Sequence, residues 1–519
     1  MTLRWMTVVF GTLLAGAGGA AAGDKTDVVR DLAGRVGPIV GSALACRDIS
    51  RPRIQVIVDK FTAVITEASS SEAERSDLTQ LLDRSVADGR SAVTSGRIDC
   101  RVADRQLGDL ERSIAGPGPS LAAVIAPSFA AAAATAPTAP VAAVGPPVRG
   151  ITDREIRFGI AGPFSGSSKE LGRQMKLGID AAFNRTNEAG GVEGRMLKLI
   201  AADDGFEPTR TAEAMKQLYE KDQVFGIIGN VGTATAAVAV PYALERRMLF
   251  FGGFTGANVI RHDPPDRYVF NYRASYAEET DAAVRYFVKM RRIPPRQIAV
   301  FAQHDAGGDA GFAGVAKSFR SLGFSDSGIL RLNYERNTVD VDDAVNQLKA
   351  QKVPIKAVVM ISAYRPAARF IEKTRDLFPG MLYSNISFVG ATALADELML
   401  LGPRYASGAI VTQVVPSVSG YSSVVLEYKT AIAKYFPGEA PDYVSLEGYV
   451  SANILIQALK RCGPQLDTEK LIDVLENTRQ LDLGLGAQLG FGRAEHQASH
   501  KIWGTALDET GKYQAIELE

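Results

Sequence analysis

Three short stretches combine glycines with hydroxyl side chains directly after an apolar segment. They read GPFSG (162–166), GNVGTAT (229–235) and GGFTGAN (252–258), and they carry Ser165, Thr233 and Thr255. Glycine lets a ligand approach the backbone, and a helix that begins at such a stretch offers unpaired N–H groups and a positive dipole end. These features suit a carboxylate. A single Gly/Thr turn is usually a helix cap, but three in corresponding places favour a binding site.

Motifs typical of enzymes are missing from the sequence. There is no dinucleotide fingerprint, P-loop, H-E-x-x-H motif or G-x-S-x-G elbow. The four histidines have no metal-ligand spacing, and no base can be assigned to Ser165. The sequence therefore predicts a binding protein without catalytic activity, metal or cofactor.

Alternating apolar and amphipathic segments must position these stretches. Expected strands lie at 155–161, 197–204, 224–229 and 249–254, and then at 297–305, 328–334, 357–363 and 384–390. Helices are expected from Lys169, Pro208 and Thr233, after Gly308, and from Asp340 and Arg365. Such alternation is typical of parallel sheets covered on both faces. Because about 365 residues are too many for one sheet, we expect an α/β fold with two doubly wound lobes and ligands at the strand ends.

The segment 23–114 predicts a small all-α module of about four helices, because apolar residues recur there at helical spacing. Cys46 and Cys100 lie in this module, 54 residues apart, and we expect a disulfide between them. Such a loop is stabilised by about 4 kcal/mol in the chain-entropy model. The alternative is two unpaired buried thiols. Cys462 lies in a helical pattern and is interpreted as a small buried hydrophobic residue.

The first 22 residues resemble an export signal, with Arg4, an apolar stretch at 7–17 and a cleavage site near Ala22. An uncleaved membrane anchor is the alternative. Residues 115–150 are rich in alanine and proline, which predicts a linker before a domain at 151–519. Export to the periplasm would permit the disulfide. Lys and Arg total 58, as do Asp and Glu, so no basic excess points to a nucleic-acid partner.

Nine stretches between Glu155 and the C-terminus follow the order of one known family. They include ELGRQMKLGIDAAF, GIIGNVGTATAAVAVPYA, FGGFTGAN, DRYVFNYRASYAEET and ISFVGATALADEL. On these stretches the chain resembles the leucine/isoleucine/valine-binding-protein class of ABC-transporter substrate-binding proteins, which have the type I periplasmic binding fold. The resemblance implies two lobes joined by three crossovers. The first lobe would comprise 151–274 and 418–486, and the second 275–417 and 487–519.

The resemblance also implies where a ligand binds. Family members hold an amino-acid carboxylate with a hydroxyl at the position of Thr233 and with backbone and hydroxyl at Gly253 and Thr255. A ring from the second lobe covers the ligand at the position of Tyr364. The first loop faces the cleft at the positions of Ser165 and Leu171.

Two departures from the family pattern concern the ligand. Amino-acid binders place a carboxylate for the ligand ammonium on the loop that here carries Ala391 and Thr392, which cannot supply it. The family motif D-x-Y-G reads Asp305-Ala306-Gly307-Gly308, so an aromatic wall is missing and Asp305 remains a candidate contact. We therefore expect a carboxylate without a free ammonium, or a larger ligand that fills the space at Gly307.

Arg273 and Tyr276 lie near the expected first crossover. Either they face the ligand, or they form a hinge ion pair and part of the core. The leading hypothesis is a periplasmic receptor that delivers a small carboxylate-bearing ligand to an ABC permease in the inner membrane. The alternative is a sensory or scaffold protein that signals through the helical module, whose partner is unknown. A hydrolase that uses Ser165 has the least support.

Overall fold

The computed structural model describes residues 22–46, 48–69, 71–95, 98–114 and 148–518. The chain forms two compact units, Met1–Val141 and Ala142–Glu519. Residues 1–21 of the predicted signal peptide and 115–147 of the predicted linker lie outside the described residues. Within the described ranges, no helix combines the length and the apolar character needed to cross a membrane.

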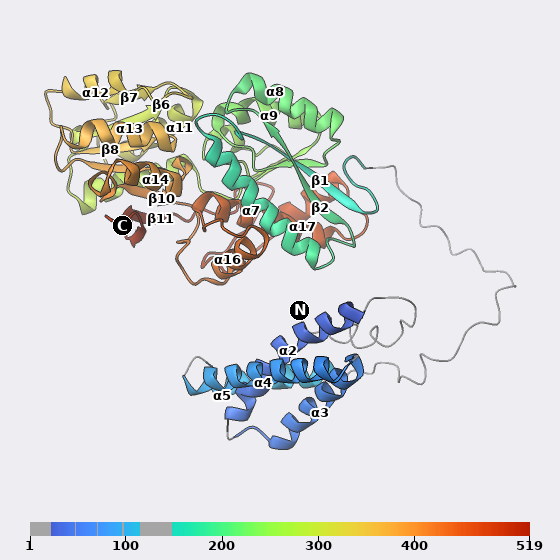
Figure 1. Ribbon diagram of the computed structural model, residues 1–519. Helices are drawn as coiled ribbons and strands as arrows, with labels where there is room; N and C mark the ends of the chain where they lie inside the picture. Colours follow the sequence, from blue (N-terminus) through green and yellow to red (C-terminus); the bar gives the residue numbers. More distant parts are fainter. Residues whose placement is uncertain (1–21, 47, 70, 96–97, 115–147, 519) are drawn as a thin grey trace. The chain divides into compact units, whose positions relative to one another are not determined.

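The first unit contains the four helices that the sequence predicts, shown in blue in Figure 1. They are α2 (Ala22–Ala45), α3 (Arg51–Ala68), α4 (Glu72–Thr94) and α5 (Cys100–Ile114). Local sequence explains two of the starts: Pro52 lies in the first turn of α3, and the Ser71 side chain accepts a hydrogen bond from Glu74 N at the start of α4.

Helices α2 and α4 pack closely because glycines line their contact. A Cβ added to Gly41 would lie 2.0 Å from the carbonyl oxygen of Val86, so only glycine fits there. A disulfide joins Cys46, just after α2, to Cys100 at the start of α5. The predicted pairing is therefore confirmed.

The second unit has two sheets, which define two lobes. The first lobe has a five-stranded parallel sheet in the order β2-β1-β3-β4-β5. Its strands are β1 (Glu155–Gly162), β2 (Met196–Asp203), β3 (Gly226–Ile228), β4 (Leu249–Phe251) and β5 (Val269–Phe270). Its helices are α7 (Lys169–Glu188), α8 (Pro208–Lys216), α9 (Thr233–Glu245), α16 (Ser423–Tyr435), α17 (Tyr443–Cys462) and α18 (Thr468–Glu476). Helix α17 returns from late in the sequence to pack along α7 (Figure 1).

The second lobe has a seven-stranded sheet in the order β12-β11-β10-β9-β8-β6-β7. Its strands are β6 (Ile298–Gln303), β7 (Arg331–Tyr334), β8 (Ala357–Ile361), β9 (Leu382–Asn385), β10 (Ile410–Gln413), β11 (Trp503–Leu507) and β12 (Tyr513–Ile516). Its helices are α10 (Tyr276–Arg285), α11 (Ala306–Ser321), α12 (Asp342–Lys349), α13 (Tyr364–Arg375), α14 (Ala391–Leu401) and α15 (Pro403–Ala406). Among the described strands of this sheet, the pairs made by β11 are antiparallel and the others are parallel. The predicted α/β fold with two doubly wound lobes is thus confirmed.

One predicted strand is wrong in position. The apolar run at 384–390 was expected to be a strand, but β9 ends at Asn385 and Ser387–Val389 form a single helical turn. Gly390 ends this turn with φ 75°, a value that favours glycine. Phe388 and Val389 are buried in the core without pairing in the sheet, so their apolar character reflects burial and not strand formation.

The chain crosses between the lobes three times, after β5, after β10 and after α18. Hydrogen bonds join the crossings to one another: Ala498 N donates to Asn271 O, and Ser499 N donates to Tyr272 O. The Tyr272 hydroxyl donates to Val414 O at 2.6 Å. The three crossings therefore form one hydrogen-bonded hinge.

Candidate ligand-binding site

Thr233 and Thr255 meet at the carboxyl end of the first sheet. Strands β3 and β4 are parallel neighbours, and a bridge between Val231 and Phe254 extends their pairing. The two hydroxyl oxygens share a hydrogen bond of 2.7 Å, and both residues are buried. Helix α9 begins here after Gly232 without a side-chain cap. This end of the first lobe therefore presents hydroxyls beside a positive helix end, as the sequence predicts for anion binding.

The facing surface of the second lobe comes from the ends of its parallel strands. Asp305 follows β6 and caps α11, because its Oδ1 accepts hydrogen bonds from Gly307 N at 2.9 Å and Gly308 N at 3.2 Å. Its Oδ2 accepts one from the Gln303 amide at 2.5 Å. Tyr334 ends β7 and donates its hydroxyl hydrogen to Gln303 Oε1 at 3.0 Å.

A small cavity of about 10 Å³ lies where the two lobes meet, room for about one water molecule. It is lined by Phe206, Thr233, Tyr276, Gln303, Asp305, Gly307, Gly308, Tyr334, Ile361, Ser362 and Phe388. A Cβ on Gly307 would lie 3.0 Å from Thr233 Oγ1, so glycine at 307 allows the lobes to approach this closely. A solute larger than water can enter only if the lobes separate, which the hinge permits.

The predicted site residues thus fall into two sets, those at the small cavity and those that lie elsewhere. Thr233, Tyr276 and Asp305 line the cavity, and Thr255 contacts it through Thr233. Tyr276 is buried, which raises the pKa of its phenol, so the hydroxyl remains a neutral donor.

Leu171 of the first lobe and Tyr364 of the second both lie beside Gly390 of the second lobe. A Cβ on Gly390 would lie 2.6 Å from Leu171 Cδ2 and 3.9 Å from Tyr364 Cδ1. Burial raises the pKa of the Tyr364 phenol. Gly253 instead leaves room for the Phe250 ring, 2.9 Å from where a Cβ would stand. None of these residues lines the small cavity in this structure.

Ser165 is exposed and lies outside the cavity. Its hydroxyl donates to Asp203 Oδ2 at 2.5 Å, and its backbone N–H donates to Oδ1 at 3.2 Å. Partial burial opposes the charge of Asp203, but the hydrogen bonds from Ser165 and from Phe164 N lower its pKa to about 2. The first glycine-rich turn therefore wraps around a charged carboxylate at the end of β2.

Arg273 forms a hinge ion pair, one of the two roles that the sequence left open. Its guanidinium lies 3.3 Å from Glu279 and 3.6 Å from Glu447, with 1% of its side chain exposed. Glu279 also accepts hydrogen bonds from Ser387 N at 2.7 Å and from the Thr412 hydroxyl at 2.6 Å. Through Glu447, this cluster connects the first crossing to α17 of the first lobe. Through Glu279, it connects the crossing to the segments of the second lobe that carry Ser387 and Thr412.

A larger cavity of about 680 Å³ is also lined by Tyr276. It is lined by charged groups of both signs, among them Arg261, Glu278, Lys317 and His500. His500 pairs with Glu278 at 2.6 Å, and Arg261 donates to backbone carbonyls of the hinge. Because Arg261, Glu278 and His500 already have partners within the protein, we favour the small cavity as the candidate for solute binding. Within the described ranges, no cluster of metal-ligating side chains occurs.

Polar contacts close the cleft at its rim. Glu207 of the first lobe accepts hydrogen bonds from Arg336 at 3.1 Å and from the Asn337 amide at 2.5 Å, both in the second lobe. Asn337 also donates to Gly205 O at 3.2 Å and accepts from the Ser167 hydroxyl at 3.3 Å. These contacts hold the lobes together without any group from a solute.

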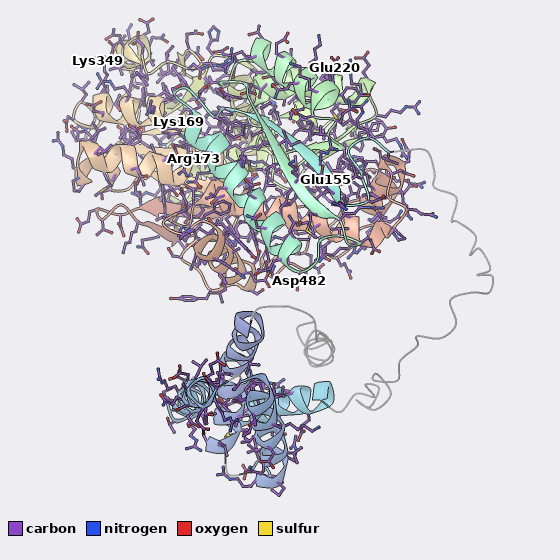
Figure 2. The ribbon with its side chains drawn as sticks, turned by 45° about the vertical axis from the view of Figure 1, so that its right-hand side comes forward. Glu155, Lys169, Arg173, Glu220, Lys349 and Asp482 are labelled. Carbon is purple, nitrogen blue, oxygen red and sulfur yellow. A yellow bond between two sulfur atoms is a disulfide. The ribbon has the colours of Figure 1, made fainter. Side chains whose placement is uncertain are left out.

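Replacing Glu207 by glutamine is expected to shift the lobes toward separation. The ion pair with Arg336 is partly exposed and worth up to about 1 kcal/mol, so the ratio of closed to open protein should fall by up to about fivefold. Spin labels at the exposed positions Glu220 and Lys349, whose side chains Figure 2 labels, measure the inter-lobe distance. Glu213→Gln on the same helix is the control, and equal distance distributions in both variants would refute the contact's role.

Sequence reasoning missed the ring of Phe206, the ring of Phe388 and the Glu207 contact. Phe388 was assigned to a strand, although the glycine at 390 signals a chain reversal directly after it. Phe206 stands in a turn with a positive φ of 65°, which sequence does not indicate for phenylalanine.

Comparison with known proteins agrees with this geometry. A family model described as "Periplasmic binding protein" matches residues 155–512. The "Leu/Ile/Val-binding protein BraC3" of Rhizobium johnstonii is 24% identical over 348 residues, which cover 64% of this chain and 86% of the relative.

Solved structures show the same fold. A possible leucine/isoleucine/valine-binding protein from Rhodopirellula baltica has a TM-score of 0.67 and 37% identity, covering 72% of this chain and 98% of its own. A substrate-binding periplasmic protein from Ralstonia solanacearum has a TM-score of 0.64 and 26% identity, covering 70% and 100%. All three similar proteins carry names of binding proteins and not of enzymes.

Proposed function

The chain belongs to the periplasmic binding protein family over residues 155–512, and we propose that its two lobes capture a small solute that carries a carboxylate. The lobes close on the solute by rotation about the three crossings. The solute carboxylate binds the hydroxyls of Thr233 and Thr255 at the start of α9. The protein performs no chemistry on it.

One observation carries this proposal. Two buried hydroxyls, those of Thr233 and Thr255, stand 2.7 Å apart at the start of a helix that no side chain caps, and Thr233 lines the cavity between the lobes. One hydroxyl hydrogen lies between the two threonine oxygens, and the Thr255 hydroxyl also donates to the Tyr276 hydroxyl at 3.5 Å, a long contact that a solute carboxylate can replace. Hydroxyl donors and unpaired helical N–H groups together stabilise a carboxylate.

Thr233→Val and Thr255→Val are each expected to weaken carboxylate binding by about 1.5–3 kcal/mol, which is about 10- to 100-fold. Valine keeps the shape of threonine and removes the hydroxyl. Isothermal titration calorimetry of the full mature chain measures the dissociation constant against a panel of L-leucine, L-phenylalanine, 3-phenylpropanoate, benzoate and cyclohexanecarboxylate.

Thr235→Val is the matched control for these variants. Thr235 lies in the same turn of α9, but its hydroxyl bonds to the carbonyls of Val231 and Gly232 and does not line the cavity. The Thr235→Val variant should bind the panel with the same affinity as the wild-type protein. If all three variants bind the panel as the unmodified protein does, the site assignment is wrong.

The proposed function includes delivery of the solute to a membrane transporter and a location in the periplasm. We infer that the closed protein presents its solute to an ABC permease in the inner membrane, after export to the periplasm and removal of a signal peptide near Ala22. The names of the similar proteins support solute binding in the periplasm. The lobe limits proposed from the sequence, 151–274 with 418–486 and 275–417 with 487–519, remain part of this proposal, as do Ser165, Leu171, Gly253 and Tyr364 as ligand contacts in the liganded protein.

A further inference from the structure

Aromatic rings form the apolar part of the inter-lobe cavity. Phe206 from the first lobe, Tyr276 beside the first crossing, and Tyr334 and Phe388 from the second lobe line it. Phe254 stands behind them, 5.4 Å from Phe388 between ring centroids. Leucine, isoleucine and valine would dominate a wall shaped for branched aliphatic groups, but Ile361 is the one such residue lining this cavity.

The chain places the Phe206 ring with two unusual features. Phe206 has φ 65°, a conformation that a bulky residue rarely adopts. Gly232 has φ 104°, and a Cβ there would lie 2.4 Å from the Phe206 ring. Phe206 N donates to Asp204 Oδ1 at 2.9 Å, which holds the turn. Strained conformations of this kind persist where a function requires them. We therefore interpret the Phe206 ring as held at the cavity for a role in binding.

Phe388 of the second lobe lies beside Phe206 of the first. Their centroids are 6.1 Å apart and their planes are inclined by only 30°. A flat ring between them needs about 7 Å, because each carbon contact requires about 3.5 Å. A small separation of the lobes would therefore open a slot for one aromatic ring, whereas a puckered aliphatic ring needs more room.

The charges of the cavity also restrict the solute. Asp305 is the acidic residue among its lining, and its oxygens already accept from two backbone N–H groups and the Gln303 amide. Arg336 lies 3.6 Å from it. Since this carboxylate is compensated within the protein, it does not need an ammonium group from a ligand.

We propose that the solute is an aromatic carboxylate without an ammonium group, its ring held between Phe206 and Phe388 and its carboxylate at Thr233 and Thr255. This inference rests on the proposed function and names the class of solute for the same site. Phe206 and Phe388 are then the residues that determine specificity.

The test compares ligands within each protein variant. Benzoate and cyclohexanecarboxylate share the carboxylate and differ in the ring, and 3-phenylpropanoate and L-phenylalanine differ by the ammonium group. Calorimetry should give benzoate about 2- to 10-fold tighter binding than cyclohexanecarboxylate, the gain typical of aromatic pairs. 3-Phenylpropanoate should bind more tightly than L-phenylalanine.

Phe388→Leu and Phe206→Leu should each bring the benzoate-to-cyclohexanecarboxylate ratio toward one, while Phe183→Leu in the core of the first lobe leaves it unchanged. The ratio compares two ligands in one protein, so a general loss of stability does not affect it, and either cleft variant suffices if the other fails to fold. A ratio of one or less in the wild type, an unchanged ratio in the cleft variants, or tighter binding of L-phenylalanine would overturn the inference.

The same data separate this inference from the proposed function. If cyclohexanecarboxylate or L-leucine binds best and Thr233→Val weakens it, carboxylate capture stands and the aromatic class is wrong. If no member of the panel binds, or if Thr233→Val and Thr255→Val leave the affinity unchanged, both proposals fail.

Discussion

Replacing Arg273 by methionine is expected to lower the free energy of unfolding of the binding domain by about 3–5 kcal/mol. Arg273 is the cation in a cluster with two buried carboxylates, Glu279 and Glu447. Methionine keeps the apolar part of the side chain but leaves both carboxylates without their cation. Removal of one partner from a buried ion pair is strongly destabilising for this reason.

Glu447 provides the internal check on this explanation. Burial raises the pKa of Glu447 to about 7; the charge of Glu279 adds to this rise, and the charges of Arg273 and Arg261 oppose it. Adding Glu447→Gln to Arg273→Met removes one uncompensated charge, and the double variant should recover part of the loss. Glutamine still needs hydrogen-bond partners in this buried place, so recovery is not complete.

Urea unfolding followed by tryptophan fluorescence measures the effect. Trp503 lies in β11 of the binding domain, and the other tryptophan, Trp5, falls within the predicted signal peptide. Arg173→Met is the control, because Arg173, which is labelled in Figure 2, pairs with the partly exposed Glu170 and Glu439, and its loss should change stability by less than about 1 kcal/mol. Equal losses in the two variants would show that the buried cluster contributes no more than a surface pair.

Removal of the disulfide is the second large expected effect. Cys46 and Cys100 close a loop with a sequence separation of 54, and replacing both by serine should destabilise the helical unit by about 4 kcal/mol. A unit of this size has a small core, so this is a large part of its stability. Its buried amides should lose up to about 1000-fold of their protection against hydrogen exchange.

Hydrogen exchange with mass spectrometry locates this loss in α2–α5. Peptides of the binding domain should keep their protection. Cys462→Ala is the control, since this cysteine is unpaired and buried in α17, where burial raises its pKa to about 11. Unchanged protection of α2–α5 in the serine variant would mean that helix packing alone stabilises the unit.

The alternation of apolar and amphipathic segments was sufficient to predict the fold. The helices expected from Lys169, Pro208 and Thr233 begin at those residues; a proline marks the start of α8 and a glycine precedes α9. The sequence also placed Thr233 and Thr255 in corresponding turns after two strands, and the parallel pairing of β3 with β4 brings these two turns together. The Cys46–Cys100 pair followed from the predicted export and the shared module.

Residues whose roles depend on contacts between the lobes could not be predicted. Phe206 and Phe388 lie far apart in the sequence, and neither lies in a glycine–hydroxyl stretch of the kind that identified Thr233. Ser165 stays a predicted ligand contact, but sequence did not indicate that its hydroxyl donates to Asp203, which follows from a β1–β2 register that places Gly162 beside Asp203. Arg273 had two equally reasonable roles until the positions of Glu279 and Glu447 were known.

A crystal structure of the mature protein with the panel carboxylate that binds most tightly tests the central claim most directly. We predict that the ligand carboxylate lies between the lobes, within hydrogen-bond distance of Thr233 Oγ1 and Thr255 Oγ1 at the start of α9. A ligand bound in the larger cavity beside Arg261 and His500, or one whose carboxylate faces the second lobe, would contradict it.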